Sequence, residues 1–272
     1  MNVRLVLSVL ACALMASTAA AQETHQIGAS SGGRVPDGSV RLAARDLVRE
    51  IGVDCDVTQA ITLGRDQNGA PHYEVSCAHG PGYRLIGGGV NEAFNCLALA
   101  ARSSSAGSPR APNCRLPANR NGTEVVAGVA RQAGLACRVD EGAMVGLSSA
   151  RLPIYEAGCA GTSGAWIEQT PGGWQVADCL TVVARGDACR FTTAAEQLTT
   201  FRRWIAGSEA NRCEPTQVRH MGESPAGPLY EAACREGPGL VVRLDASRAV
   251  REIIPCPAAH VGDGCRFAEG RP

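Results

Sequence analysis

The chain has 272 residues, a formal net charge of zero and an aromatic content of only 4%. A neutral chain without a basic stripe lacks the electrostatic footprint of a nucleic-acid or anionic-membrane partner. Cores made mostly of Ala, Val and Leu bury little area per residue, so covalent cross-links have more stability to contribute.

The N-terminus reads as a targeting segment. Arg4 precedes an apolar run over 5–15 that is too short to span a bilayer, and Ala19 to Ala21 form a small-residue cleavage site. We expect residues 1–21 to be a signal peptide, and 22–38, rich in Gly and Ser, to be a flexible arm. Cys12 leaves a lipoprotein signal as an alternative. No later stretch is long and apolar enough to predict a membrane span after signal cleavage.

The remainder repeats three times. The motif Tyr-Glu-x-x-Cys begins at Tyr73, Tyr155 and Tyr230, and each copy sits among four cysteines. These are Cys55, Cys77, Cys96 and Cys114; Cys137, Cys159, Cys179 and Cys189; and Cys213, Cys234, Cys256 and Cys265. We place module one at 39–116, module two at 123–191 and module three at 192–272. So many cysteines are typical of an oxidising compartment, hence a periplasmic or secreted protein.

Each module opens with a helical pattern. The first runs from Leu42 to Ile51 with Ser39 as a candidate N-cap, and the second follows Thr123. In the third, Thr193 and Glu196 have the spacing of a capping box. Glycines at 52, 134 and 207 are suited to the helix ends.

Strand patterns follow each helix. They are clearest in module two, where 165–169 and 174–178 flank the turn sequence 170–173, and in module three at 240–244 and 250–254. We therefore predict an α+β fold: three tandem modules, each with one helix packed on a four-stranded antiparallel sheet, stapled by disulfides.

The cysteine positions predict a pairing. In an antiparallel hairpin, the residue numbers of two opposed residues add up to a constant, and half of that sum gives the centre of the turn. For the first and second cysteines of each module, this centre falls on turn-like residues. A first-to-second disulfide is then geometrically reasonable, which leaves the third and fourth cysteines to pair.

Candidate chemistry is sparse. The five histidines occupy no equivalent repeat positions and have no metal-ligand spacing, and we expect them at the surface or at strand edges. In the Tyr-Glu pair, we expect the Tyr to pack in the core and the Glu to be a solvated partner for Arg. We predict no catalytic, cofactor-binding or metal-binding residue.

Two tryptophans are candidate ligand contacts. Trp166 and Trp174 flank one predicted hairpin of module two, and their index sum places them near each other. Paired exposed Trp side chains often mark a glycan or protein contact, although core packing explains them as well.

The order helix, strand, Gly-containing turn, Tyr-Glu and Gly-rich turn resembles the PepSY domain, best seen from Leu47 to Ile86. It is also similar in plan to the helix-plus-sheet repeats of β-lactamase-inhibitor proteins. The cysteines depart from both patterns. The resemblance implies a non-enzymatic binding or inhibitory module of the cell envelope and carries over no functional residue.

We thus expect an exported, non-enzymatic binding protein whose partner is a protein or glycan of the envelope, without a cofactor. The alternatives are an envelope hydrolase or thiol–disulfide enzyme, and a glycan-binding protein that uses the module-two hairpin.

Overall fold

The computed structural model describes residues 37–103, 113–259 and 264–267. All of them belong to one compact unit that starts at Pro36. The predicted signal peptide and nearly all of the predicted arm lie outside the described residues, as do nine residues of the Ser- and Pro-rich insertion after the third cysteine of module one.

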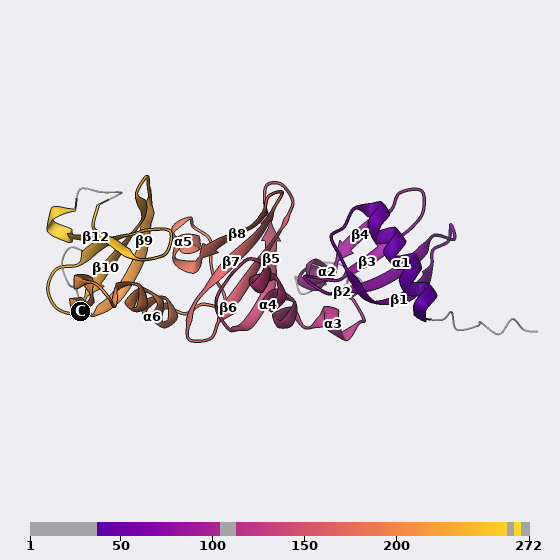
Figure 1. The fold of residues 1–272 in the computed structure, drawn as a ribbon, viewed down its shortest axis with the longest axis horizontal. Helices are drawn as coiled ribbons and strands as arrows, with labels where there is room; N and C mark the ends of the chain where they lie inside the picture. The colour runs from indigo at the N-terminus through magenta and orange to yellow at the C-terminus, as the bar shows by residue number, and fades with distance from the viewer. Residues whose placement is uncertain (1–36, 104–112, 260–263, 268–272) are drawn as a thin grey trace, which may run out of the picture. The chain divides into compact units, whose positions relative to one another are not determined.

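The described chain forms three four-stranded antiparallel sheets, one in each predicted module (Figure 1). Module one contains α1 (Asp37–Ile51), β1 (Val57–Arg65), β2 (Pro71–Cys77), β3 (Tyr83–Ile86), β4 (Glu92–Asn95) and α2 (Cys96–Ser103). α3 (Pro117–Arg120) leads into module two, which contains α4 (Gly122–Gln132), β5 (Val139–Leu147), β6 (Pro153–Cys159), β7 (Thr162–Thr170), β8 (Gly173–Asp178) and α5 (Cys179–Ala184). Module three contains α6 (Ala194–Ile205), η1 (Glu209–Arg212), β9 (Pro215–Ser224), β10 (Gly227–Cys234), β11 (Leu240–Leu244), β12 (Val250–Pro255) and η2 (Cys256–Ala258).

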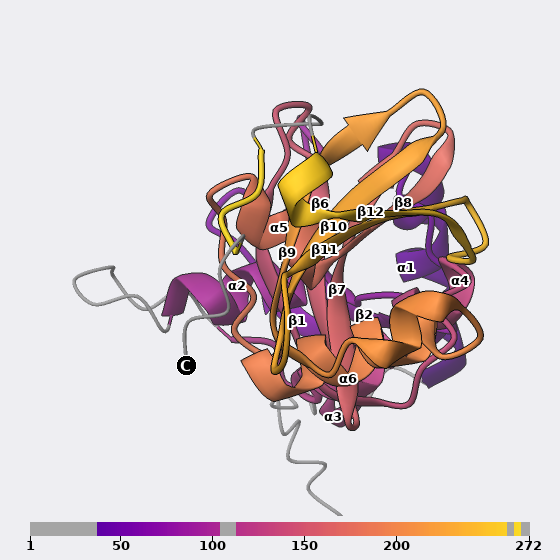
Figure 2. The same cartoon turned by 90° about the vertical axis from the view of Figure 1, so that its left-hand side faces the viewer.

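The main helix of each module packs on one face of its sheet, and Figure 2 shows α6 along the sheet of module three. The cause is the spacing of apolar residues, which gives each helix one apolar stripe. In α4, for example, Val126 and Val129 are fully buried against Ala157 and Ile167 of the sheet. The predicted α+β architecture is confirmed.

The twelve cysteines of the three modules form the predicted disulfides. In every module the first cysteine pairs with the second and the third with the fourth: Cys55–Cys77, Cys96–Cys114, Cys137–Cys159, Cys179–Cys189, Cys213–Cys234 and Cys256–Cys265. Each module is therefore cross-linked once across its first hairpin and once beyond its fourth strand.

The predicted helix starts were right in one module of three. Thr193 and Glu196 do form a reciprocal capping box at the start of α6. α1, however, begins two residues before Ser39. α4 is capped by the side chain of Asn121, which accepts from the amide of Glu124, rather than by Thr123.

The sequence patterns did not predict α2 and α5, the two short helices that start at the third cysteine of modules one and two. These helices prove central to how the modules join. No helix in the described ranges is long and apolar enough to cross a bilayer.

Candidate functional site

The glutamate of the repeated Tyr-Glu motif is buried, which corrects the expectation of a solvated side chain. Glu74, Glu156 and Glu231 are each 0% exposed. A carboxylate without water needs hydrogen-bond donors from the protein, because leaving it unpaired costs several kcal/mol. The same segment meets this need in every module: the residues just after the fourth cysteine.

Module one shows the arrangement in its most complete form. Glu74 Oε2 accepts from the amide of Arg115 at 2.7 Å, and Oε1 accepts from the amide of Leu116 at 2.7 Å. The side-chain amide of Asn119 donates to Oε1 at 2.9 Å and also to the carbonyl of Val75. One carboxylate thus ties the sheet to the segment that leads into module two.

The other two modules keep the core of this contact. Glu156 Oε1 accepts from the amide of Phe191, and Glu231 Oε1 accepts from the amide of Phe267, both at 2.6 Å. Glu231 Oε2 also accepts a hydrogen bond from the guanidinium Nε of Arg219 at 2.6 Å. The second oxygen of Glu156 is buried without a hydrogen bond.

Each of these carboxylates lies beside the second disulfide of its module, within 4.8 Å of both sulfurs. This arrangement of one Glu and two Cys has the composition of a metal site. Each pair of sulfurs is joined in a disulfide, however, and metal binding requires the thiolate. We therefore assign the glutamates a structural role.

The tyrosine of the motif lies at the junction between modules. The side-chain amide of Asn95, the last residue of β4 in module one, donates to Tyr155 Oη in module two at 3.1 Å. Asn95 Oδ1 also accepts from the amides of Leu97 and Ala98, so the same side chain caps α2.

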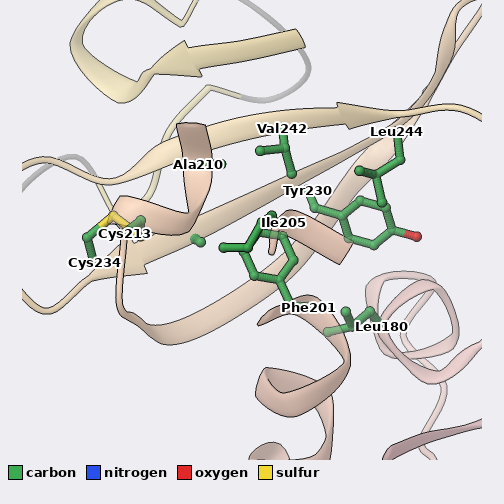
Figure 3. Packing of buried hydrophobic residues seen from close by; sticks show 10 residues of the cluster. Leu180, Phe201, Ile205, Ala210, Cys213, Tyr230, Cys234, Val242 and Leu244 are labelled. Atoms are coloured by element: carbon green, nitrogen blue, oxygen red, sulfur yellow. A yellow bond between two sulfur atoms is a disulfide. The ribbon is translucent and has the colours of Figure 1, made fainter. Parts of the chain in front are cut away.

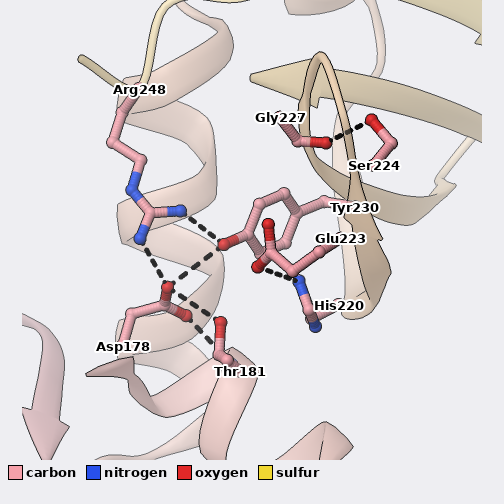
Figure 4. Close-up of polar contacts among 8 residues, drawn as sticks. All are labelled: Asp178, Thr181, His220, Glu223, Ser224, Gly227, Tyr230 and Arg248. Carbon is pink, nitrogen blue, oxygen red and sulfur yellow. Dashed lines mark hydrogen bonds and ion pairs between the residues drawn. The ribbon is translucent and has the colours of Figure 1, made fainter. Parts of the chain in front are cut away.

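The next junction repeats this contact one module further along (Figure 4). Tyr230 Oη donates a hydrogen bond to Asp178 Oδ2 at 3.1 Å. Asp178 also caps α5, because its Oδ1 accepts from the backbone amide of Thr181. Asp178 ends β8 as Asn95 ends β4. Arg248 adds an ion pair with Asp178 at 2.7 Å and lies over the ring of Trp204.

A leucine follows each of these capping residues and enters the next module. Leu97 of α2 is 6% exposed and belongs to the core of module two. Leu180 of α5 is 3% exposed and packs in the core of module three with Phe201 and Tyr230 (Figure 3). Each junction therefore has a donor segment, Asn/Asp-Cys-Leu, and an acceptor surface around the motif tyrosine of the following module.

The two ends of the array differ from the junctions. In module three the donor residues are replaced by Pro255, Cys256 and Pro257, and η2 forms in place of an α-helix. In module one the residue opposite the motif tyrosine is Thr62, which is exposed, whereas its counterparts Met144 and His220 are buried.

His220 lies on β9, an edge strand of its sheet, as one of the two expected positions required, but its side chain is buried rather than at the surface. Its ring meets the ring of Tyr230 edge-on, with 5.1 Å between the centroids, and Nε2 lies 3.3 Å from Glu223 Oε1. Burial lowers the pKa of His220; Glu223 and Asp178 oppose this effect and Arg185 adds to it. His25 and His260 lie outside the described residues.

We predict that module three loses stability as the pH falls through the range just below 6.5. The folded state disfavours protonated His220, so the unfolded state binds more protons there, and the stability present at higher pH is lost. Urea unfolding at pH 7.5 and 5.5, read by Trp fluorescence, should show this loss in the native chain and a smaller one in His220→Gln. An equal pH dependence in both chains would contradict it.

Trp166 and Trp174 do not form the expected pair. Trp166 lies opposite Ala177 and Trp174 opposite Gln169, so the two side chains point to opposite faces of the sheet. Trp174 packs on Tyr155 at the edge of the core and lines a cleft of about 280 Å³ with Asp54 and Tyr83.

The junction residues were not among the predicted site residues, although their sequence carries a signal. Asn95-Cys96-Leu97 and Asp178-Cys179-Leu180 share a pattern, and the third copy breaks it with two prolines. A residue that caps a helix just before a cysteine, followed by an apolar residue, indicates a short helix rather than a loop.

No protein-family model matches the chain, and no curated protein resembles it significantly.

Proposed function

We propose that the chain is an exported, non-enzymatic binding protein of the cell envelope that presents its three modules to a protein partner. The observation that carries the proposal is the repeated junction. Asn95 and Asp178 each form a hydrogen bond with the motif tyrosine of the following module. Leu97 and Leu180 pack in the hydrophobic core of that same module. Modules coupled in this way present a continuous, preorganised surface, which lowers the entropic cost of binding.

The disulfides support an oxidising compartment, since six cross-links in one chain are typical of secreted and periplasmic proteins. They also support rigidity, because each module closes two covalent loops around a small core. The buried carboxylates of the Tyr-Glu motif each accept a hydrogen bond from a backbone amide of their own module, which supports a structural role for them.

The test is affinity capture with the mature chain, residues 22–272, from an envelope extract of its own source. We expect one protein to be enriched at near-equal amounts on the native chain and to be absent from a reduced and alkylated chain, which lacks the disulfide framework. Retention of no protein, or equal retention by both chains, would overturn the protein-binding proposal.

A second candidate function, glycan binding, rests on Trp174. Its indole lines a cleft with Tyr83, whose pKa is raised to about 12 by burial and by Asp54, and the neutral phenol can donate a hydrogen bond. Replacing Trp174 with Ala should abolish retention on cell-wall material, with Trp166→Ala on the opposite face as the control. Unchanged retention of Trp174→Ala would count against this candidate.

A further inference from the structure

We propose that module one carries an unoccupied copy of the junction acceptor, and that it binds a partner protein through a short helix that starts with Asn or Asp and places Leu two residues later. This inference rests on the proposed binding function and names the surface and the chemistry of the partner. It follows from the repeat itself, since the chain contains two occupied copies of the same surface.

The acceptor consists of equivalent positions in all three modules. In module two it is formed by Tyr155 and its cross-strand neighbour Met144, and in module three by Tyr230 and His220. Tyr73 and Thr62 are the corresponding pair in module one.

Burial separates the occupied acceptors from the unoccupied one. Tyr155 is 1% exposed and Tyr230 is 0% exposed, because a donor helix covers each of them. Tyr73 is only half-buried and Thr62 is exposed. No hydrogen bond joins the Tyr73 hydroxyl to the part of the chain that the structure describes.

The internal donors define what fits. Each supplies one side chain that both caps its own helix and bonds the tyrosine hydroxyl: Asn95 toward Tyr155 and Asp178 toward Tyr230. Each then supplies a leucine that packs beside that tyrosine. A partner helix with the same start would bury the apolar surface of module one and satisfy the Tyr73 hydroxyl.

A second copy of the same chain does not supply this donor at its C-terminal end. There the equivalent positions are Pro255 and Pro257, which have neither a capping side chain nor a leucine. Both internal donors are engaged within their own chain. In the full sequence, Asn or Asp followed two residues later by Leu occurs only in these two donors, so the occupant is a different protein.

The probe is a synthetic peptide of residues 175–191 closed by its own Cys179–Cys189 disulfide, which holds the start of the donor helix together. Labelled at one end, it is titrated onto the mature chain, and binding is read by fluorescence anisotropy. We expect saturable binding of one peptide per chain, weakened about tenfold by Tyr73→Phe, as expected for the loss of one hydrogen bond to a charged group.

Four further comparisons keep the result specific. The same peptide with Asp178→Ala or with Leu180→Ala should bind at least about tenfold more weakly. Thr62→Met, which copies the Met144 of module two, should tighten binding. The melting temperature of Tyr73→Phe should match that of the native chain, since the hydroxyl bonds no described residue.

Absence of saturable binding, or equal binding by native and Tyr73→Phe chains, would overturn the inference. The capture experiment separates this failure from failure of the proposed function. If an envelope protein is captured equally by native and Tyr73→Phe chains, the protein binds partners through another surface, and the acceptor of module one is not the site.

Discussion

Replacing Glu74 with Ala should destabilise module one by about 3–5 kcal/mol. The substitution leaves the amides of Arg115 and Leu116 and the side-chain amide of Asn119 without their acceptor in a buried site. It also opens a cavity beside the disulfide between Cys96 and Cys114.

The tryptophans make this prediction specific. All three Trp residues of the chain lie in modules two and three. Trp174 lines a cleft with Asp54 and Tyr83 of module one, so it senses that module only at their shared edge. We expect Glu74→Ala to give an early urea transition by far-UV circular dichroism, with a much smaller change in the Trp transition. Glu92→Ala, an exposed change on β4, is the control and should change stability by less than about 0.5 kcal/mol. A native-like transition in Glu74→Ala would refute the structural role of this carboxylate.

Replacing Asp178 with Ala should uncouple module three from module two and cost about 2–4 kcal/mol. The change removes the N-cap of α5, the acceptor of the Tyr230 hydroxyl and the partner of Arg248. We expect Trp204, which lies under Arg248 and beside Tyr230, to report a separate unfolding transition by fluorescence.

Asp178→Asn is the matched control, because asparagine occupies the equivalent position at the first junction. It keeps a capping oxygen and a hydrogen bond to Tyr230 but loses the charge that pairs with Arg248. We expect it to cost about 1 kcal/mol and to leave one cooperative transition. If Asp178→Ala also unfolds in one transition at native stability, the junction does not couple the modules.

The module architecture and the disulfides were predictable because the sequence contains each helix, strand and cysteine pattern three times. A single cysteine pair gives little information on register, but three hairpins whose index sums all centre on turn residues make the first-to-second pairing the simplest solution. The local helix signals were weaker. Ser39 and Thr123 are plausible caps in isolation, and only the capping box at Thr193 has the reciprocal glutamate that marks a helix start.

Register errors explain the failure at the tryptophans. The index sum of Trp166 and Trp174 predicted that they lie near each other across the hairpin, whereas the strands pair Trp166 with Ala177. An odd offset moves a side chain to the other face of the sheet.

β-Bulges shift the register of a different hairpin, the one between β5 and β6 of module two. Each bulge adds a residue to one strand, and these insertions are not visible in the sequence pattern.

The burial of Glu74, Glu156 and Glu231 could not be read from their strands. A glutamate beside a tyrosine on a strand is normally solvated, and the groups that bury it come from a segment 35 to 45 residues later. Those donors are mostly backbone amides, which any sequence provides. The junction contacts were hidden for a related reason, since they join residues of different modules.

The direction of the junctions has a consequence for synthesis. Every donor lies in the earlier module and every acceptor in the later one: Leu97 serves module two and Leu180 serves module three. In a chain that emerges N-terminus first, the donor leucine of each junction therefore emerges before the module whose core it completes. Folding can advance module by module behind the emerging chain, and no finished module waits for a residue from a later donor helix.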